Sequence, residues 1–529
     1  MFELNPSILY GEENFTFCEK IMPKALAILG TASDVGKSLV SAGLGRLLYQ
    51  KGINVAPFKS QNMSLNSFVT VEGGEMGRAQ VLQAQACGLL PHVDMNPILL
   101  KPEADHRSQV IVQGKVWGRY DANGYFGCRP ELFRFVQESY ARLAARHDVL
   151  IIEGAGSAAE VNLRDRDLVN WPVVDMADAS VILVADIDRG GVFAQIIGTL
   201  DLLEPHERRR VIGVIVNKFR GDRRLFDDGV RILEERTGVP VLGVVPFLRQ
   251  LELDQEDSLT VEPQDSKPFS TQTVNVAVVL LPHLSNFTDF NAIAAEDDVA
   301  FHYIKRPEQL EGADVVILPG TKNTIADFRY LLAHGFCEKL EAHVREKNGE
   351  LVGLCGGFQM LGKRVTDPQG VEEGGEIQGL GLLDMTSELL LDKHTSQVTA
   401  QPLFLPGTSD CRVLGYEIRM GISHRFSGSP CFQMVERPGG REGESQVDGA
   451  MSSDGSVWGT YIHGVFDQPG FRRAWLNRIR QRKGLQAFEV SVSETVSRRM
   501  STALDRWAEH VAQHVNVQYI LSYLGVSNK

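Results

Sequence analysis

The chain has 529 residues and carries 54 Lys and Arg against 67 Asp and Glu, a formal net charge of −13. This length predicts roughly two to four domains, and a hydrophobic content of 43% is enough for buried cores. The acidic balance argues against nucleic acid or an anionic membrane surface as the main partner, although it allows a local basic pocket.

The seven cysteines are odd in number, widely scattered and without a CxxC pair. This pattern predicts a reducing cytoplasmic location and neither a disulfide framework nor a zinc site. No apolar run reaches the ~18 residues that a membrane-spanning helix needs. Residues 1–23 hold four Glu and no long apolar core, unlike a secretory signal, so we expect an N-terminal extension there.

Short apolar segments alternate with segments of helical length through the first half of the chain. Strands of this continuous apolar kind, separated by helices, predict a parallel sheet covered on both faces. We place this first α/β domain at residues 24–250. Its predicted strands are 25–29, 54–58, 149–154, 180–186, 211–217 and 239–246.

A polar, acidic stretch with two prolines follows at 251–273 and predicts a linker. A second alternating series then predicts another α/β domain at 274–471. From 472 to 529 the chain becomes charged and helical, and we expect this tail to pack on the second domain. The predicted strands of the second domain are 274–282, 313–320, 350–357, 412–420 and 457–463.

The segment "ILGTASDVGKSLVSAGLGRLL" (28–48) places a small-residue loop between a strand and a helix. Such a loop directs backbone N–H groups and a helix N-terminus at phosphate oxygens, while a lysine bridges the phosphates and a hydroxyl holds Mg²⁺. Five residues stand between the first glycine and the Gly-Lys pair, one more than in the common pattern. The predicted ATP-binding residues here are Gly30, Thr31, Ser33, Val35, Gly36, Lys37 and Ser38.

The lengthened loop resembles the GTxxxxGK(S/T) loop of dethiobiotin synthetase and related amide-forming ligases. Chromosome-partitioning ATPases are a rival interpretation, and they carry a lysine early in the loop. Thr31 and Ala32 stand at that place here, which counts against the rival.

Three further residues extend the predicted nucleotide site. Glu153 ends an apolar strand, so its carboxylate is expected to face the loop and reach Mg²⁺ together with Ser38. Glu75, in "GGEMGRAQ", is a second metal candidate. Asn217 ends the strand "VIGVIVN" and could donate to and accept from an adenine edge.

A second site is predicted around Cys355 in "ELVGLCGGFQMLG" (350–362), where a strand, a tight turn and a helix form a nucleophile elbow. His463, in "GTYIHGVF", follows far downstream, which is the Cys…His order of class I glutamine amidotransferases. Backbone N–H groups of Gly320 and Gly356 are the expected oxyanion donors. His283 and His424 are competing candidates for the base.

The histidine motif departs from the common triad. Class I glutaminases usually carry Glu two residues after the His, whereas this chain has Val465. The third, orienting group must come from elsewhere or be missing. Asp467 is near in sequence but poorly placed.

An ATP site and a glutaminase site in one chain predict one joint reaction. ATP converts a carboxylate to an acyl phosphate, and ammonia released from glutamine displaces the phosphate to form a carboxamide. From the residues alone, we therefore expect an ATP- and glutamine-dependent amidation of a carboxylate.

Several blocks together resemble the cobyric acid synthase family, from about Lys24 through the tail and in the family's order. They are "GTASDVGKSLVSAGLGRLL", "PFKSQNMSLNSFVT", "EMGRAQVLQAQA", "NPILLKP", "GLCGGFQMLG" and "YIHGVF". That family also lacks the Glu after its histidine. The resemblance implies a dethiobiotin synthetase-like ATPase domain fused to a class I-type glutamine amidotransferase domain, using ATP and Mg²⁺.

The resemblance also implies the reaction. Such enzymes amidate the b, d, e and g side-chain carboxylates of adenosylcobyrinic acid a,c-diamide, with glutamine as the second substrate, on the route to cobalamin. The amide- and hydroxyl-rich segment 58–67 lies next to the predicted nucleotide loop. Its expected contacts with substrate carboxylates or the phosphoryl group come from Lys59, Gln61, Asn62 and Asn66. In "GYEIRMG", Arg419 stands where a His is expected.

Two alternatives remain open from the sequence. Cobyrinic acid a,c-diamide synthase has the same two domains and acts on two other carboxylates, but the block "SQNMSLNSFVT" favours cobyric acid synthase. A non-catalytic P-loop switch with an inactive glutaminase domain is the other. The intact set of reactive residues argues against it: Lys37, Ser38, Glu153, Cys355 and His463.

Overall fold

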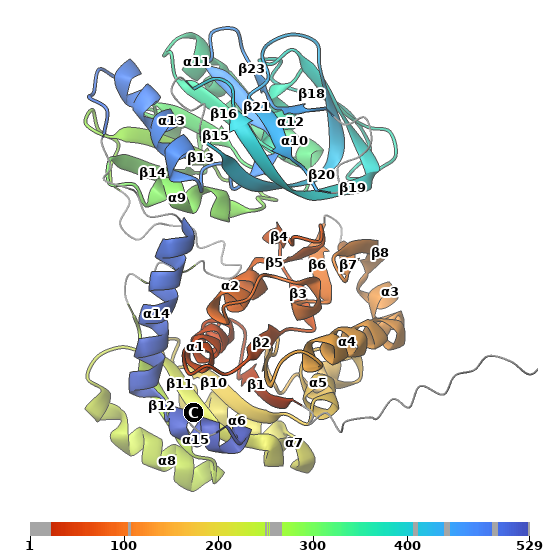
Figure 1. The fold of residues 1–529 in the computed structure, drawn as a ribbon, viewed down its shortest axis with the longest axis vertical. Helices are drawn as coiled ribbons and strands as arrows, with labels where there is room; N and C mark the ends of the chain where they lie inside the picture. Colours follow the sequence, from red (N-terminus) through yellow and green to blue (C-terminus); the bar gives the residue numbers. More distant parts are fainter. Residues whose placement is uncertain are drawn as a thin grey trace, which may run out of the picture.

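The structure is a computed structural model that describes residues 23–103, 107–248, 251, 253, 267–405, 411–438, 445–488 and 496–526. The predicted extension at 1–23 lies outside these residues except for Pro23, as does most of the predicted linker at 251–273. The described chain forms two α/β lobes stacked along the long axis (Figure 1).

The first lobe is built on a parallel six-stranded sheet, which confirms the predicted fold class. In sheet order its strands are β12 (Val241–Pro246), β11 (Val211–Phe219), β10 (Ser180–Asp186), β1 (Lys24–Gly30), β9 (Val149–Glu153) and β2 (Val55–Phe58). Its helices are α1 (Lys37–Gln50), α2 (Arg78–Ala86), α3 (Ala122–Gly127), α4 (Arg129–Ala144), α5 (Trp171–Met176), α6 (Val192–Leu202), α7 (Pro205–Arg210) and α8 (Asp227–Thr237).

The central strand β1 shows why this sheet is covered on both faces. Leu26 and Ile28 point into one hydrophobic core, and Ala27 and Leu29 point into the other. A strand buried on both faces needs a continuous apolar run, which "ALAIL" supplies. The adjacent strands β1 and β9 run parallel in the sheet. The loop that follows β1 and the last residue of β9, Glu153, therefore meet at the same edge of the sheet.

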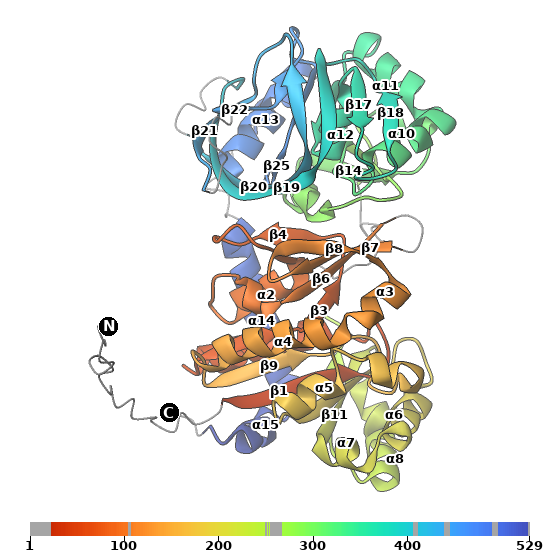
Figure 2. The same cartoon turned by 90° about the vertical axis from the view of Figure 1, so that its right-hand side faces the viewer.

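Two small sheets lie between the first lobe's main sheet and the second lobe (Figure 2). One consists of β3 (Gln61–Met63), β6 (Ile98–Pro102), β7 (Arg107–Val112) and β8 (Lys115–Asp121). The other is an antiparallel hairpin of β4 (Ser67–Val69) and β5 (Glu75–Gly77). The apolar pattern of the sequence predicts no strands in these segments, because the strands are short and partly polar.

The second lobe contains a sheet that is parallel except at one edge, and its helices cover it. The strands are β14 (Val299–Ile304), β13 (Val274–Val279), β15 (Val315–Leu318), β16 (Glu350–Leu354), β24 (Val457–Thr460) and β23 (Ala450–Met451). The helices are α9 (Asn291–Ala294), α10 (Thr324–Ala333), α11 (Phe336–Arg345), α12 (Gly356–Leu361) and α13 (Pro469–Arg482).

A second, largely antiparallel sheet flanks this one and is dominated by two long strands. Its members are β18 (Gly375–Gln378), β17 (Arg364–Asp367), β19 (Met385–Pro402), β20 (Val413–Arg425), β25 (Ile462–His463), β21 (Phe432–Glu436) and β22 (Val447–Asp448). The predicted strand at 412–420 is part of β20. Its partner β19 is not predicted, because it is half polar and lacks the continuous apolar run on which the prediction relies.

The C-terminal helices divide between the two lobes, which corrects the expected packing of the tail. Helix α13 packs into the second lobe through residues such as Phe471 and Trp475. Helices α14 (Val496–His514) and α15 (Val517–Leu524) instead return to the first lobe (Figure 1). Trp507 is buried there, and its indole N–H donates to the carbonyl of Leu39 at 2.6 Å. The apolar stripe of α14 thus completes a core of the first lobe.

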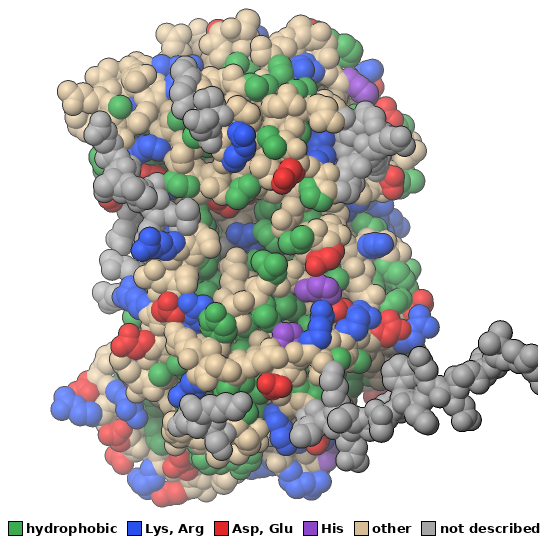
Figure 3. Space-filling view, viewed as in Figure 1, with side chains coloured by type: hydrophobic (Ala, Val, Ile, Leu, Met, Phe, Trp, Pro, Cys, Tyr) green, Lys and Arg blue, Asp and Glu red, His purple; other side chains and the backbone are tan. Residues whose placement is uncertain are grey.

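Within the described residues, no helix is long and apolar enough to cross a membrane. The space-filling view shows acidic and basic side chains interspersed over one face (Figure 3). On this face, the net negative charge is not gathered into a single patch.

We expect Trp507→Ala to destabilise the first lobe by about 3–5 kcal/mol, because it leaves a cavity where α14 meets α1. Thermal and urea unfolding would measure the loss. Tyr523→Ala is the matched control, since this aromatic residue of α15 is 48% exposed. Equal unfolding curves for the two variants would contradict the role given to α14.

Two candidate active sites

The phosphate-binding loop lies between β1 and α1, as the sequence predicts. Lys37 is buried, and its Nζ donates to the carbonyl oxygens of Ala32 and Gly156, each at 3.0 Å. Gly36 precedes the helix with a φ of +95°, a backbone region that favours glycine. A Cβ there would clash with Nδ2 of Asn217. The loop is therefore shaped around a glycine at this position.

A buried carboxylate lies under the loop. Oε1 of Glu153 accepts hydrogen bonds from Ser38 Oγ at 2.8 Å and Lys59 Nζ at 2.9 Å, and Oε2 accepts one from Gln83. Burial by itself would raise the pKa of Glu153, but the charge of Lys59 and these hydrogen bonds hold it below its usual value. Glu153 is therefore an anion placed beside the Ser38 hydroxyl.

The donor set at this position suits Mg²⁺. Ser38 and Glu153 offer hard oxygen ligands from two neighbouring elements. Among the described residues, no group of three or more His, Cys, Asp or Glu side chains is arranged to hold a metal ion. Two protein oxygens match the way Mg²⁺ binds, since it keeps water and phosphate oxygens as its other ligands.

The remaining predicted loop residues have different surroundings. Thr31 is buried with its hydroxyl 3.3 Å from Oε1 of Gln195, whereas Ser33 is exposed. The side chain of Val35 belongs to the core, so only its backbone faces the loop. Asn217 is 4% exposed and donates to the Val35 carbonyl at 2.9 Å. Asn217 therefore braces the loop in this structure, and adenine recognition by it stays a prediction.

Glu75 does not join the group around Glu153, which corrects its place as a metal candidate. Its two carboxylate oxygens are paired with Lys101 at 2.8 Å and with Lys393 of the second lobe at 2.5 Å. Burial would raise the pKa of Glu75, but the two lysine charges lower it well below its usual range. Lysines from both lobes already pair with this carboxylate, so it belongs to the interface between the lobes.

The four residues predicted to contact substrate separate into two pairs. Lys59 and Gln61 face the nucleotide side: Lys59 touches Glu153, and Gln61 accepts from the Tyr125 hydroxyl at the edge of a pocket that also includes Gly156. Asn62 follows Gln61 in β3, so its side chain points to the opposite, buried face.

Asn66 is also placed differently from the prediction. It is 6% exposed, and its Oδ1 accepts from the backbone N–H of Phe287 in the second lobe at 3.2 Å. Asn66 thus contributes to the interface between the lobes, whereas the prediction made it a substrate contact.

The second candidate site begins with the turn at Cys355, between β16 and α12. Cys355 has φ 50° and ψ −107°, a strained backbone for a residue with a Cβ. A Cβ on either Gly353 or Gly357 would clash with the backbone of a neighbouring segment. The glycines therefore make the tight elbow possible, and the elbow presents the thiol at the N-terminus of α12.

His463 lies at this elbow with an aspartate behind it. Nδ1 of His463 is 2.7 Å from Oδ2 of Asp289, and Oδ1 of Asp289 accepts from the N–H of Gly464 at 2.9 Å. Burial alone would lower the pKa of His463. The charge and hydrogen bond of Asp289, with a hydrogen bond to Cys355, instead raise that pKa to about 10. A charged imidazole beside a cysteine favours the thiolate.

Asp289, rather than Asp467, is the third group that the sequence leaves unassigned, since Asp289 holds the Nδ1 edge of the ring. It lies in the short turn Phe287–Phe290, far upstream of His463. The segment "SNFTDF" carries no spacing signal for this role. The two competing histidines are placed elsewhere: His283 forms its own pair with Asp327 at 2.7 Å, and His424 lines a different pocket.

The two predicted oxyanion glycines come together near the thiol. A Cβ on Gly320 would lie 3.1 Å from Cε1 of His463. A Cβ on Gly356 would lie 2.6 Å from Cγ2 of Thr321, the residue after Gly320. Gly356, Cys355 and His463 line one cavity, so the geometry is compatible with both backbone N–H groups serving as donors.

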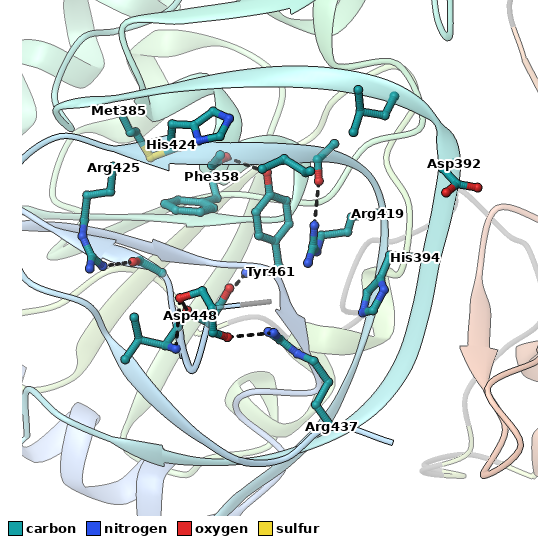
Figure 4. Close-up of a pocket in the computed structure, with 17 residues that line it drawn as sticks. Phe358, Met385, Asp392, His394, Arg419, His424, Arg425, Arg437, Asp448 and Tyr461 are labelled. Atoms are coloured by element: carbon teal, nitrogen blue, oxygen red, sulfur yellow. Dashed lines mark hydrogen bonds between the residues drawn. The ribbon is translucent and has the colours of Figure 1, made fainter. Parts of the chain in front are cut away.

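A larger pocket of about 580 Å³, shown in Figure 4, adjoins this cavity. Arg419 is in the lining of both. Arg419 donates to the Gly421 carbonyl at 2.8 Å and covers the ring of Tyr461. The Tyr461 hydroxyl lies 2.6 Å from Oγ of Ser423. Arg419, which stands where a His is expected, thus places a charged side chain between the larger pocket and the cavity at Cys355.

Comparisons with known proteins match a different family model to each lobe. Residues 26–261 match the model of the CobQ/CobB/MinD/ParA nucleotide binding domain, and residues 275–471 match that of the CobB/CobQ-like glutamine amidotransferase domain. The cobyric acid synthase of Syntrophobacter fumaroxidans is 49% identical over 95% of this chain and 99% of that protein. That of Yersinia enterocolitica is 47% identical over 95% of this chain and 98% of its own.

This chain belongs to the cobyric acid synthase family. A member of this family combines a nucleotide-binding domain with a glutamine amidotransferase domain, and the P-loop and the Cys355 elbow fall within the two matched ranges. The predicted family and enzyme class are confirmed. The individual roles of the site residues are taken up as proposals below.

We expect Asp289→Asn to lower the kcat for glutamine hydrolysis by about 10²- to 10⁴-fold, because the imidazole loses its orienting charge. The alkaline limb of the kcat/KM profile should also move to lower pH. The His463 pKa is raised to about 10, and without the carboxylate the ring loses its proton earlier as pH rises. Asp467→Asn is the control, and an equal loss in both variants would contradict the assignment.

Proposed function

We propose that this chain catalyses the ATP- and glutamine-dependent amidation of the b, d, e and g carboxylates of adenosylcobyrinic acid a,c-diamide, giving adenosylcobyric acid. The observation that carries the proposal is the presence of two complete but different sites in a chain of this family. One has a P-loop with a buried carboxylate, and the other has a Cys–His–Asp group. The free thiols among the described residues suit a cytoplasmic enzyme.

At the second site, the thiolate of Cys355 attacks the side-chain carbonyl carbon of glutamine. The backbone N–H groups of Gly320 and Gly356 stabilise the oxyanion. The imidazolium of His463 donates its proton to the leaving nitrogen, so ammonia departs and a glutamyl thioester remains on Cys355. Water, deprotonated by His463, then attacks the thioester carbonyl, so glutamate leaves and the Cys355 thiolate and the His463 imidazolium are restored.

At the first site, a corrinoid carboxylate attacks the γ-phosphorus of ATP, forming an acyl phosphate and releasing ADP. Lys37 is placed to bridge the phosphates once its loop carbonyls are exchanged for phosphate oxygens. Ser38 and Glu153 would hold Mg²⁺, which neutralises phosphate charge when bound. Ammonia then attacks the acyl carbon, and phosphate leaves as the amide forms.

The pocket beside Gly156 is where we place the corrinoid carboxylate. It measures about 300 Å³ and adjoins the carbonyl that accepts from Lys37. Gln61 offers an amide and Arg166 offers positive charge to a carboxylate, whereas Arg164 is already paired with Glu204 and Glu207.

Cys355→Ser tests the division between the sites. We expect it to lose glutamine-dependent amidation and to keep amidation from free ammonia, because the first site is untouched. Mass spectrometry of adenosylcobyrinic acid a,c-diamide, incubated with enzyme, ATP and Mg²⁺, would follow the four replacements of OH by NH₂. Loss of both activities in this variant would contradict the proposal.

Lys37→Ala is the reciprocal variant and should lose amidation from either nitrogen source, because the phosphates lose their bridging cation. Assaying cobyrinic acid in parallel separates this activity from that of a cobyrinic acid a,c-diamide synthase. Amidation of cobyrinic acid at the a and c positions alone would favour that second enzyme.

A further inference from the structure

The hairpin of β4 and β5 belongs to the first lobe, yet it packs against the wall of the glutaminase site. The ring of Phe68 meets the ring of Tyr416 edge-on, with centroids 5.1 Å apart and planes at 60°. Val69 joins Tyr416 and Ile418 in one buried hydrophobic cluster, and all three are at most 8% exposed. Two residues of the hairpin thus cover one short stretch of β20.

That stretch of β20 contacts both reactive residues. Tyr416 pairs with His463 between β20 and β25, and their rings stack with centroids 5.4 Å apart and planes at 20°. Two residues further on, the carbonyl of Ile418 is 3.4 Å from Sγ of Cys355. The side of β20 that the hairpin supports therefore bears directly on the thiol and the imidazole.

A second set of contacts leads to the aspartate. The N–H of Ser67 donates to Oδ1 of Asn286 at 3.0 Å, and the N–H of Phe287 donates to Oδ1 of Asn66 at 3.2 Å. Asn286 and Phe287 open the turn that carries Asp289. The same segment of the first lobe thus touches the supports of all three members of the Cys–His–Asp group.

The imidazole needs such support because one hydrogen bond does not fix a ring. The bond from Nδ1 to Asp289 fixes one edge of His463, but the ring can still tilt about that bond. Stacking on Tyr416 restrains the tilt, and Gly320 closes the space at Cε1. Tyr416 is held in turn by the edge of Phe68.

We propose that Phe68 is a positioning residue for His463, so that the nucleotide-binding lobe completes the glutaminase site through Tyr416. This inference rests on the proposed function, because it assigns glutamine hydrolysis to Cys355 and His463. Phe68 touches no reacting atom. Phe68 acts by holding the Tyr416 ring in the plane that stacks on His463.

The test is Phe68→Ala in the full chain. We expect the kcat for glutamate release to fall about 10- to 100-fold, because a shift of ~1 Å at a reacting group costs that much. The KM for glutamine should stay within about twofold, since the glutamine cavity keeps its lining. Phe68→Leu should restore most of the kcat. Amidation from free ammonia should persist and shows that the first lobe is folded.

Thr395→Val is the matched control. Its hydroxyl donates to the Gly73 carbonyl at 2.7 Å, so this variant removes another contact between the second lobe and the same hairpin, away from the aromatic stack. Its kcat should stay near that of the unaltered chain. Tyr416→Leu breaks the stack from the opposite side and should reproduce the loss, which keeps the test valid if Phe68→Ala does not fold.

Two results would overturn the proposal. One is an unchanged kcat in both Phe68→Ala and Tyr416→Leu, and the other is an equal loss in Thr395→Val, which would indicate general loosening of the interface. Failure of the proposed function would give a different result from failure of the role proposed for Phe68. A chain that releases glutamate but never amidates the corrinoid refutes the corrinoid reaction, while Phe68 is still judged from glutamate release alone.

Discussion

One short hairpin packs against one long strand and lies between the surroundings of the two sites. The β4–β5 hairpin connects, through the start of α2, to Gln83 and so to Glu153 and the P-loop. On its other side it reaches Tyr416 and the turn of Asp289.

Charged groups are also buried at the interface between the lobes. Glu75 is paired with Lys101 from its own lobe and Lys393 from the other, and Lys393 also donates to Gln109 at 3.0 Å. Burial lowers the pKa of Lys393 to about 7 against the opposing effect of Glu75. A buried group of this kind adds little net stability, but removing one partner costs about 3–5 kcal/mol.

The sequence predicted the parts of this chain whose signals are local. Each of these signals spans only a few consecutive residues: the P-loop, the Cys355 elbow and the buried parallel strands. Backbone shape dictates the residue types in the loop and the elbow, and burial on both faces dictates those in the strands. Asp289 could not be found this way, because its partner His463 lies in a different strand and only the fold brings them together. Asn62 and Asn66 were assigned by composition, and strand alternation and the interface decide where they point.

The position of α14 has a consequence for synthesis on the ribosome. The first lobe's sheet uses residues from the first half of the chain, but one of its cores is closed by Trp507 and its neighbours near the end. Translation delivers the chain in order, so this lobe exposes an apolar face until almost the whole polypeptide has emerged. Its final packing is therefore a late event that waits for the C-terminal helices to leave the ribosome.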